Sequence, residues 1–178
     1  MLPKSKNNRH AFTLIELLVV MAIIAVLSGL GLMGFGTIQV KSRDSRRKQD
    51  LASISKALDT YYNDYGVYPG DTNGYIWGCG SDGIQVCNWG DPWQDGNGTL
   101  YMNSLPQDPA SNQRYFYDRV SDHSYYLFAR LENKLDGDAA VNEAGDPSFY
   151  TGYVCDETSL GCNYVIMSTN LTNKPAVN

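Results

Sequence analysis

The chain has 178 residues, a net charge of −5 and four cysteines, and its length suits one domain of ordinary size with an extension. Residues 1–49 carry eight basic and two acidic residues, a net charge of +6, whereas residues 50–178 carry six basic and seventeen acidic residues, a net charge of −11. Because the bulk of the protein is acidic, it repels nucleic acid phosphates, and we expect no direct binding of nucleic acid.

A long apolar segment follows the short basic segment MLPKSKNNRHA. From Leu17 to Val40 the chain runs for 24 residues without a charge, which is longer than the apolar part of a secretory signal and suits a helix that spans a bilayer. Glu16 lies at the start of this segment. A carboxylate in a membrane costs free energy unless it finds a partner, so intramembrane acids usually have a function. The alternative is a signal anchor with a glutamate of no consequence.

The segment AFTLIELLVVMAIIAVL resembles the class III signal of type IV pilins and type II secretion pseudopilins. Members of that family have a small residue, then Phe, then TLIE, then an apolar helix. The resemblance implies that a prepilin peptidase cleaves between Ala11 and Phe12 and methylates the new amino group of Phe12. It also implies that Glu16 binds the Phe12 amine of a neighbouring subunit during filament assembly. This chain departs from the family at the cleavage site, because most members have Gly there and it has Ala11, which is small and should fit.

The helix is predicted to continue beyond Val40. Apolar residues spaced three and four apart in LASISKALDTYYNDYG predict one buried face, and Gly66 with Pro69 just beyond it predicts the helix end. Four glycines between residues 29 and 36 mark either a bend or close helix packing, and the sequence does not separate the two. The basic cluster of residues 41–48 suits lipid head groups, acidic domains of neighbouring subunits, or a solvated face.

The remaining chain predicts an α+β fold. YFYDRV and SYYLFARLE alternate in polarity and are joined by SDHS, which predicts a hairpin, and NYVIMSTN supplies a third strand. The stretches YYNDYGVYPG and LPQDP add to the family resemblance. We therefore expect a long N-terminal hydrophobic helix packed on a small antiparallel sheet, with a long loop-rich insertion between Pro69 and Leu105. The expected parts are a cleaved leader (1–11), a transmembrane or fibre-core helix (12–40), its amphipathic continuation (41–66) and an acidic globular domain (67–178).

The four cysteines form two close pairs, Cys79 with Cys87 and Cys155 with Cys162. This spacing predicts two short disulfide loops in an oxidising compartment. Zinc binding is a weaker interpretation, because the spacings are wider than CxxC and no histidine accompanies either pair, and free thiols are another.

Three tryptophans occupy the insertion, at positions 77, 89 and 93. Exposed tryptophans would stack on sugars or bind other surfaces, but tryptophans are usually largely buried, so we expect a local core.

The stretch LDGDAAVNEAGD holds oxygen ligands at short spacing, which suits calcium although the pattern is not that of an EF-hand. Calcium binding by major pseudopilins favours this interpretation, and a solvated acidic loop is the alternative. The candidate ligands are Asp136, Asp138, Asn142, Glu143 and Asp146.

The sequence thus predicts a structural filament subunit and no enzyme, since no nucleophile elbow, P-loop or metalloprotease motif is present. Expected partners are other copies of the chain, prepilin peptidase, the inner-membrane assembly platform and the membrane. The leader would be cytoplasmic and the globular domain extracytoplasmic, and the product would be a cell-surface or periplasmic filament, either a type IV pilus or a type II secretion pseudopilus. The alternative is a membrane-anchored surface binding module that does not polymerise and uses its tryptophan-rich loop.

Overall fold

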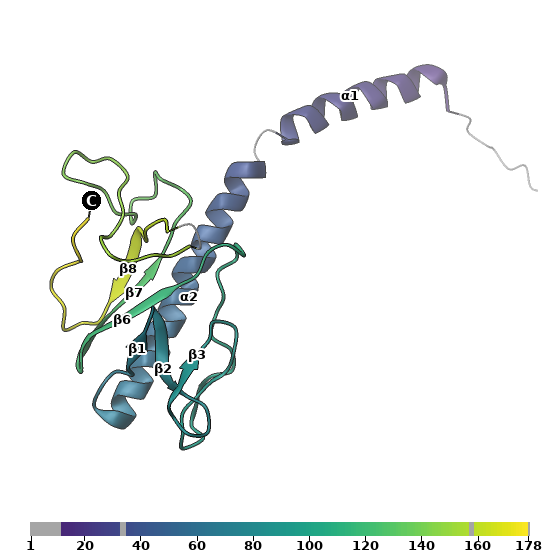
Figure 1. The fold of residues 1–178 in the computed structure, drawn as a ribbon. Coiled ribbons are helices and arrows are strands. Elements are labelled where there is room, and N and C mark those ends of the chain that lie inside the picture. Colours follow the sequence, from purple (N-terminus) through teal and green to yellow (C-terminus); the bar gives the residue numbers. More distant parts are fainter. Residues whose placement is uncertain (1–11, 33–34, 157–158, 178) are drawn as a thin grey trace, which may run out of the picture. The chain divides into compact units, whose positions relative to one another are not determined.

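The computed structural model describes residues 12–32, 35–156 and 159–177 of the chain (Figure 1). Two helices and several antiparallel sheets confirm the α+β class. The chain divides into two compact units, Met1–Gln39 and Val40–Asn178. The elements in chain order are α1 (Leu14–Leu32), α2 (Phe35–Tyr65), β1 (Asp71–Thr72), β2 (Tyr75–Cys79), β3 (Gln85–Cys87), β4 (Trp93–Gln94), β5 (Leu100–Met102), β6 (Phe116–Ser121), β7 (Ser124–Ala129) and β8 (Tyr164–Met167).

Helix α1 has 19 residues, and its only charged residue is Glu16 in the first turn. Its strongly apolar sequence favours burial on every side, which a lone helix cannot provide. Within residues 12–32 and the other described ranges, no helix combines the length and hydropathy needed to cross a membrane. The glycine-rich segment falls where α1 ends and α2 begins, and residues 33 and 34 between them lie outside the described residues.

Helix α2 buries the face that the sequence predicts. Leu51, Ile54 and Leu58, spaced three and four apart, are fully buried in the main hydrophobic core. The helix ends at Tyr65, and Gly66 follows with a φ of +72°. A left-handed residue at this position is the common end of a helix and favours glycine, so the predicted end at Gly66 is confirmed.

The predicted hairpin and third strand are also confirmed. Strand β6 pairs antiparallel with β7, and β7 pairs antiparallel with β8, so the sheet order is β6-β7-β8. The turn lies where SDHS was expected, with Ser121 opposite Ser124. Figure 1 shows α2 running along this sheet.

Both faces of the sheet are covered, as the alternation in β7 shows. Tyr125 and Leu127 belong to the core cluster that includes α2, whereas Phe128 belongs to a second cluster with Tyr150 and the Cys155–Cys162 region. Because neighbouring strand residues point to opposite faces, β7 joins the two clusters.

The region between Pro69 and Leu105 is less loop-like than expected. It contains the three-stranded sheet β1-β2-β3 and the pair β4-β5. The predicted local core is present, since Trp89 is 8% exposed and Trp93 is fully buried, but Trp77 is 40% exposed. The strands are only two to five residues long and are separated by Gly- and Asp-rich turns, which explains why alternation did not reveal them.

Candidate functional site

The first turn of α1 holds a capping box formed by Thr13 and Glu16. The Thr13 backbone N–H donates to Glu16 Oε2 at 2.8 Å, and the Thr13 hydroxyl donates to the same oxygen at 2.7 Å. The Glu16 N–H in turn donates to Thr13 Oγ1 at 3.4 Å. The spacing Thr-x-x-Glu before an apolar run is the sequence signature of this motif. It predicts that Glu16 caps its own helix, a role that the apolar surroundings of Glu16 alone do not indicate. Glu16 therefore has a partner within its own chain.

The apolar side chains of α1 and the residues before it are exposed. Phe12 is 88% exposed, and the large apolar side chains from Leu14 to Leu27 are between 49% and 82% exposed. Such a surface favours burial by lipid or by another protein surface. Phe12 and Glu16 both belong to this exposed segment, whereas Ala11 lies outside the described residues.

Part of the basic cluster of residues 41–48 binds carboxylates of its own domain. None of the three predicted surroundings, lipid, neighbouring subunits or solvent, included such contacts. Arg47 is fully buried and binds three carboxylates. Its distances are 2.7 Å to Asp44, 2.7 Å to Asp108 and 2.8 Å to Glu132. Asp44 also accepts hydrogen bonds from the backbone N–H groups of residues 132 and 133. This buried network joins α2 to the LPQDP loop and to the segment after β7, so Arg47 is a structural residue of the domain.

Arg43 completes the network from the neighbouring turn. Its guanidinium binds Glu132 through two nitrogens. The hydrogen bond from Arg43 is the largest cause that lowers the pKa of Glu132, to about 2 from its usual 4.5, and the bond and charge of Arg47 add to it. Glu132 therefore carries its charge throughout the neutral range.

Lys48 occupies part of the predicted calcium site. Its Nζ lies 2.6 Å from Asp136 Oδ1 and 2.6 Å from Asp138 Oδ2. Asn142 lies in a separate turn, where its side-chain oxygen accepts hydrogen bonds from the backbone N–H groups of residues 144 and 146. Among the described residues, no group of three or more His, Cys, Asp or Glu side chains is placed to hold a metal ion. The five candidate ligands are thus divided, and the single ammonium group of Lys48 forms ion pairs with two of them.

The cysteines form two disulfides, Cys79–Cys87 and Cys155–Cys162, with Cα–Cα distances of 5.2 and 5.0 Å. The first joins β2 to β3, and the second closes a loop that covers the outer face of the β6-β7-β8 sheet. Both therefore tie short, loop-rich parts of the domain to its sheets.

Comparison with known proteins points to the N-terminal segment. The family model for the prokaryotic N-terminal methylation motif matches residues 6–32. The chain is 26% identical over 142 residues to the type II secretion system core protein G of Aeromonas hydrophila, which covers 78% of this chain and 91% of that protein.

Two fimbrial proteins are similar over shorter stretches. The chain is 35% identical over 66 residues to the fimbrial protein EcpC of Eikenella corrodens, and 38% identical over 58 residues to a probable minor fimbrial protein of Dichelobacter nodosus. These matches cover 37% and 33% of this chain, and 43% and 36% of the two fimbrial proteins. No solved structure matches the chain.

Proposed function

We propose that the chain is a member of the type IV pilin and pseudopilin family, and that it is cleaved between Ala11 and Phe12, methylated at Phe12 and assembled through α1 into a filament outside the cytoplasm. The observation that carries the proposal is the coincidence of the methylation motif with a helix whose apolar side chains are exposed. A structural subunit of a filament needs such a surface, because each subunit buries it against its neighbours.

Cleavage would change the charge next to Glu16. Before cleavage, Phe12 is part of an uncharged peptide unit, and afterwards it carries a cationic amine. At a separation of ~4 Å and an effective dielectric constant near ~20, a carboxylate and an amine attract each other by about 4 kcal/mol. The Phe12 amine of one subunit would therefore meet Glu16 of the next, which fixes the axial register between copies.

Before assembly, α1 would lie in the inner membrane, with the basic leader in the cytoplasm and the acidic domain outside. The two disulfides support this orientation, because disulfides persist in oxidising compartments. Prepilin peptidase and an inner-membrane assembly platform are the partners that this route requires.

The filament proposed here is a type II secretion pseudopilus in preference to a type IV pilus. The secretion protein is similar over most of both chains, whereas the fimbrial proteins are similar over less than half of theirs.

Processing is tested first, by expressing the full chain with a prepilin peptidase and measuring the mass of its N-terminal peptide. We expect a singly methylated peptide that begins at Phe12. An Ala11→Gly variant serves as the matched control, because it restores the residue usual in the family. An uncut chain, alongside efficient cleavage of the Ala11→Gly variant, would show that the natural sequence does not enter this pathway.

The alternative is a membrane-anchored binding module that does not polymerise. A cleft in the domain, lined partly by Trp89, favours some binding role. The two functions are distinguished by purified filaments, since a monomeric anchor forms none even after cleavage.

A further inference from the structure

The loop between β4 and β5 contains the tripeptide Asn-x-Thr, at Asn97 to Thr99 in the stretch DGNGT. This tripeptide is the acceptor of N-linked glycosylation, which requires that it lie in a surface loop and that the domain be outside the cytoplasm. The two disulfides support the second condition, because such bonds persist in oxidising compartments. The geometry of the loop bears on the first.

The loop is a compact turn built around the carboxylate of Asp95. This side chain is almost fully buried, and its Oδ1 accepts hydrogen bonds from the backbone N–H groups of Asn97, at 2.9 Å, and Thr99, at 2.8 Å. The Gly98 N–H donates to the backbone oxygen of Asp95 at 3.1 Å, and Gly98 has a φ of +85°, which favours glycine. The carboxylate is thus held inside the turn, whereas Asn97 and Thr99 are exposed on its surface.

The Asn97 side chain has one hydrogen to spare. Its Nδ2 donates one hydrogen bond, at 2.9 Å, to the hydroxyl of Tyr65. A primary amide carries two N–H donors. A glycan joined to Nδ2 replaces one hydrogen and leaves the other, so the bond to Tyr65 is kept when the glycan takes the outward position. The folded loop therefore accommodates the modification without loss of this hydrogen bond.

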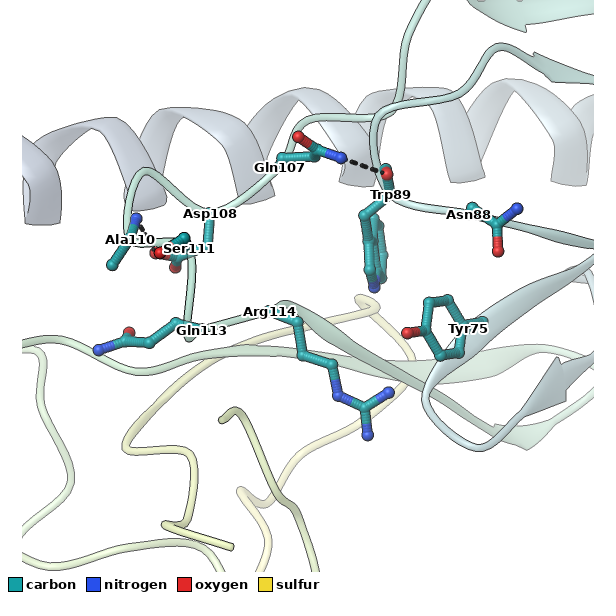
Figure 2. Close-up of a pocket in the computed structure, with 9 residues that line it drawn as sticks. All are labelled: Tyr75, Asn88, Trp89, Gln107, Asp108, Ala110, Ser111, Gln113 and Arg114. Carbon is teal, nitrogen blue, oxygen red and sulfur yellow. Dashed lines mark hydrogen bonds between the residues drawn. The ribbon is translucent and has the colours of Figure 1, made fainter. Parts of the chain in front are cut away.

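The position of the loop keeps a glycan away from the other sites. Tyr65 is the last residue of α2, and the helix from Val40, where the globular unit begins, to Tyr65 is ~38 Å long at ~1.5 Å per residue. No residue of the loop lines the cleft of about 340 Å³ beside Trp89 (Figure 2). A glycan on Asn97 therefore leaves both the proposed assembly segment and this cleft free.

A second Asn-x-Thr tripeptide, which begins at Asn170, provides an internal comparison. Asn170 is also exposed, and its Nδ2 donates to the backbone oxygen of His123 at 2.8 Å. The two sites differ two residues before the asparagine, where the first has Asp95 and the second has Ser168. Bacterial acceptor sites usually carry an acidic residue at that position, which favours Asn97 over Asn170.

We propose that Asn97 is the acceptor of an oligosaccharide carried on a polyprenyl diphosphate. Nδ2 attacks the anomeric carbon of the first sugar, a C–N bond forms, and the bond from that carbon to the diphosphate oxygen breaks. The polyprenyl diphosphate leaves with the bonding electron pair, and the amide proton passes to a base of the transferring enzyme. The proposal rests on the extracytoplasmic orientation of the proposed function, but on neither cleavage nor assembly.

The test is mass spectrometry of the full chain, purified from the cells that produce it. Chymotrypsin cleaves after Trp93 and Leu100 and releases residues 94–100, in which Asn97 is the only asparagine. We expect this peptide to carry a glycan on Asn97 and the peptide that contains Asn170 to be unmodified.

Matched variants separate enzymatic transfer from other additions. Thr99→Ala removes the hydroxyl of the acceptor tripeptide but keeps the backbone N–H that binds Asp95, so it should abolish the modification. Thr99→Ser keeps the hydroxyl and should retain it. Asn97→Gln should also abolish the modification, whereas Asn170→Gln should leave it unchanged.

The disulfides distinguish failure of this proposal from failure of the proposed function. An unmodified or merely deamidated Asn97, in protein whose two disulfides have formed, would overturn the glycan alone. A glycan that survives Thr99→Ala, or one found only on Asn170, would also overturn it. A chain without disulfides and without glycan would contradict the extracytoplasmic orientation as well. Glycosylation of a chain that forms no filaments would support the acceptor role of Asn97 and contradict the filament.

Discussion

At the scale of single residues, the capping box and the proposed intersubunit charge pair give Glu16 two roles that substitutions can separate. Glu16→Gln keeps an acceptor for the Thr13 N–H but removes the charge. We expect this variant to be cleaved and methylated but to form filaments at least about tenfold less efficiently, because an attraction of about 4 kcal/mol is lost. Filament yield after shearing, measured by immunoblot, reports the result.

Thr13→Ala is the matched control for that experiment. It removes the cap at a cost of about 1 kcal/mol to the helix but leaves the carboxylate charged, so filaments should still form. The reverse pattern, with assembly lost in Thr13→Ala and kept in Glu16→Gln, would mean that Glu16 acts only as a helix cap.

Arg47 should be the most sensitive charged residue of the domain. Arg47→Met leaves Asp44 and Asp108, which are almost fully buried, without their cation. Removal of one partner from a buried ion pair typically costs about 3–5 kcal/mol. We expect a loss of that size in the free energy of unfolding, measured by urea denaturation. Arg46→Met, one residue away but 65% exposed in its side chain, should cost less than about 1 kcal/mol; equal effects would exclude the structural role of Arg47.

At the scale of elements, Lys48 ties helix α2 to the acidic loop, so its ammonium competes with any calcium ion there. We expect the melting temperature of the natural chain to be nearly the same in calcium and in EDTA. Lys48→Ala should lower it, whereas Lys56→Ala, on an exposed part of the same helix, should not.

A calcium site in the natural chain would give a different result. At a concentration about 100 times its dissociation constant, a ligand stabilises the folded state by about 2.7 kcal/mol. A clear rise in melting temperature with calcium would therefore support the calcium interpretation of the Asp136–Asp146 loop.

The elements differ in how well the sequence predicts them. The buried face of α2 and the β6-β7 hairpin follow from local periodicity, which is visible within one window of sequence. The burial of Arg47 is not visible in this way, because its partners Asp108 and Glu132 lie 61 and 85 residues further along the chain. A run of basic residues is ordinarily a solvated face, and only the tertiary structure shows which of its members are buried.

The candidate sites show the same division. The Thr-x-x-Glu cap and the methylation motif are local patterns and can be found in the sequence. The cleft joins Tyr75, Trp89 and Arg114, which come from three separate segments of the chain. The proposed assembly segment is therefore visible in the sequence, whereas the cleft is visible only in the folded structure.

At the scale of the whole molecule, the basic and acidic parts of the sequence form ion pairs with each other inside the folded chain. Arg43, Arg47 and Lys48 are bound to carboxylates of the acidic unit, so much of the basic cluster is neutralised before any filament contact forms. Lys41 and Arg46 are the exposed members of that cluster and are the better candidates for contacts with lipid or neighbouring subunits.

These ion pairs predict how the free energy of unfolding depends on pH. The pKa of Glu132 is about 2 in the folded chain and 4.5 without its partners, chiefly because of the hydrogen bond from Arg43. In that interval the unfolded chain binds the proton more readily, so the stabilisation is complete above about pH 4.5 and is lost as the pH falls through about 2. Lys48 also lowers the pKa of Asp136, against the effect of burial, which adds to the loss.

Urea unfolding midpoints measured between pH 7 and pH 2 test this prediction in the natural chain and in Glu132→Gln. The variant should be less stable at pH 7, because the buried Arg47 loses one of its carboxylates. Its stability should fall less steeply with acid, so the two curves should converge towards pH 2. Parallel curves would mean that Glu132 is not held charged by the arginines. Convergence would show that Arg43 and Arg47, which follow the apolar segment in the sequence, act mainly within the globular unit. There they join α2 to the segment after β7.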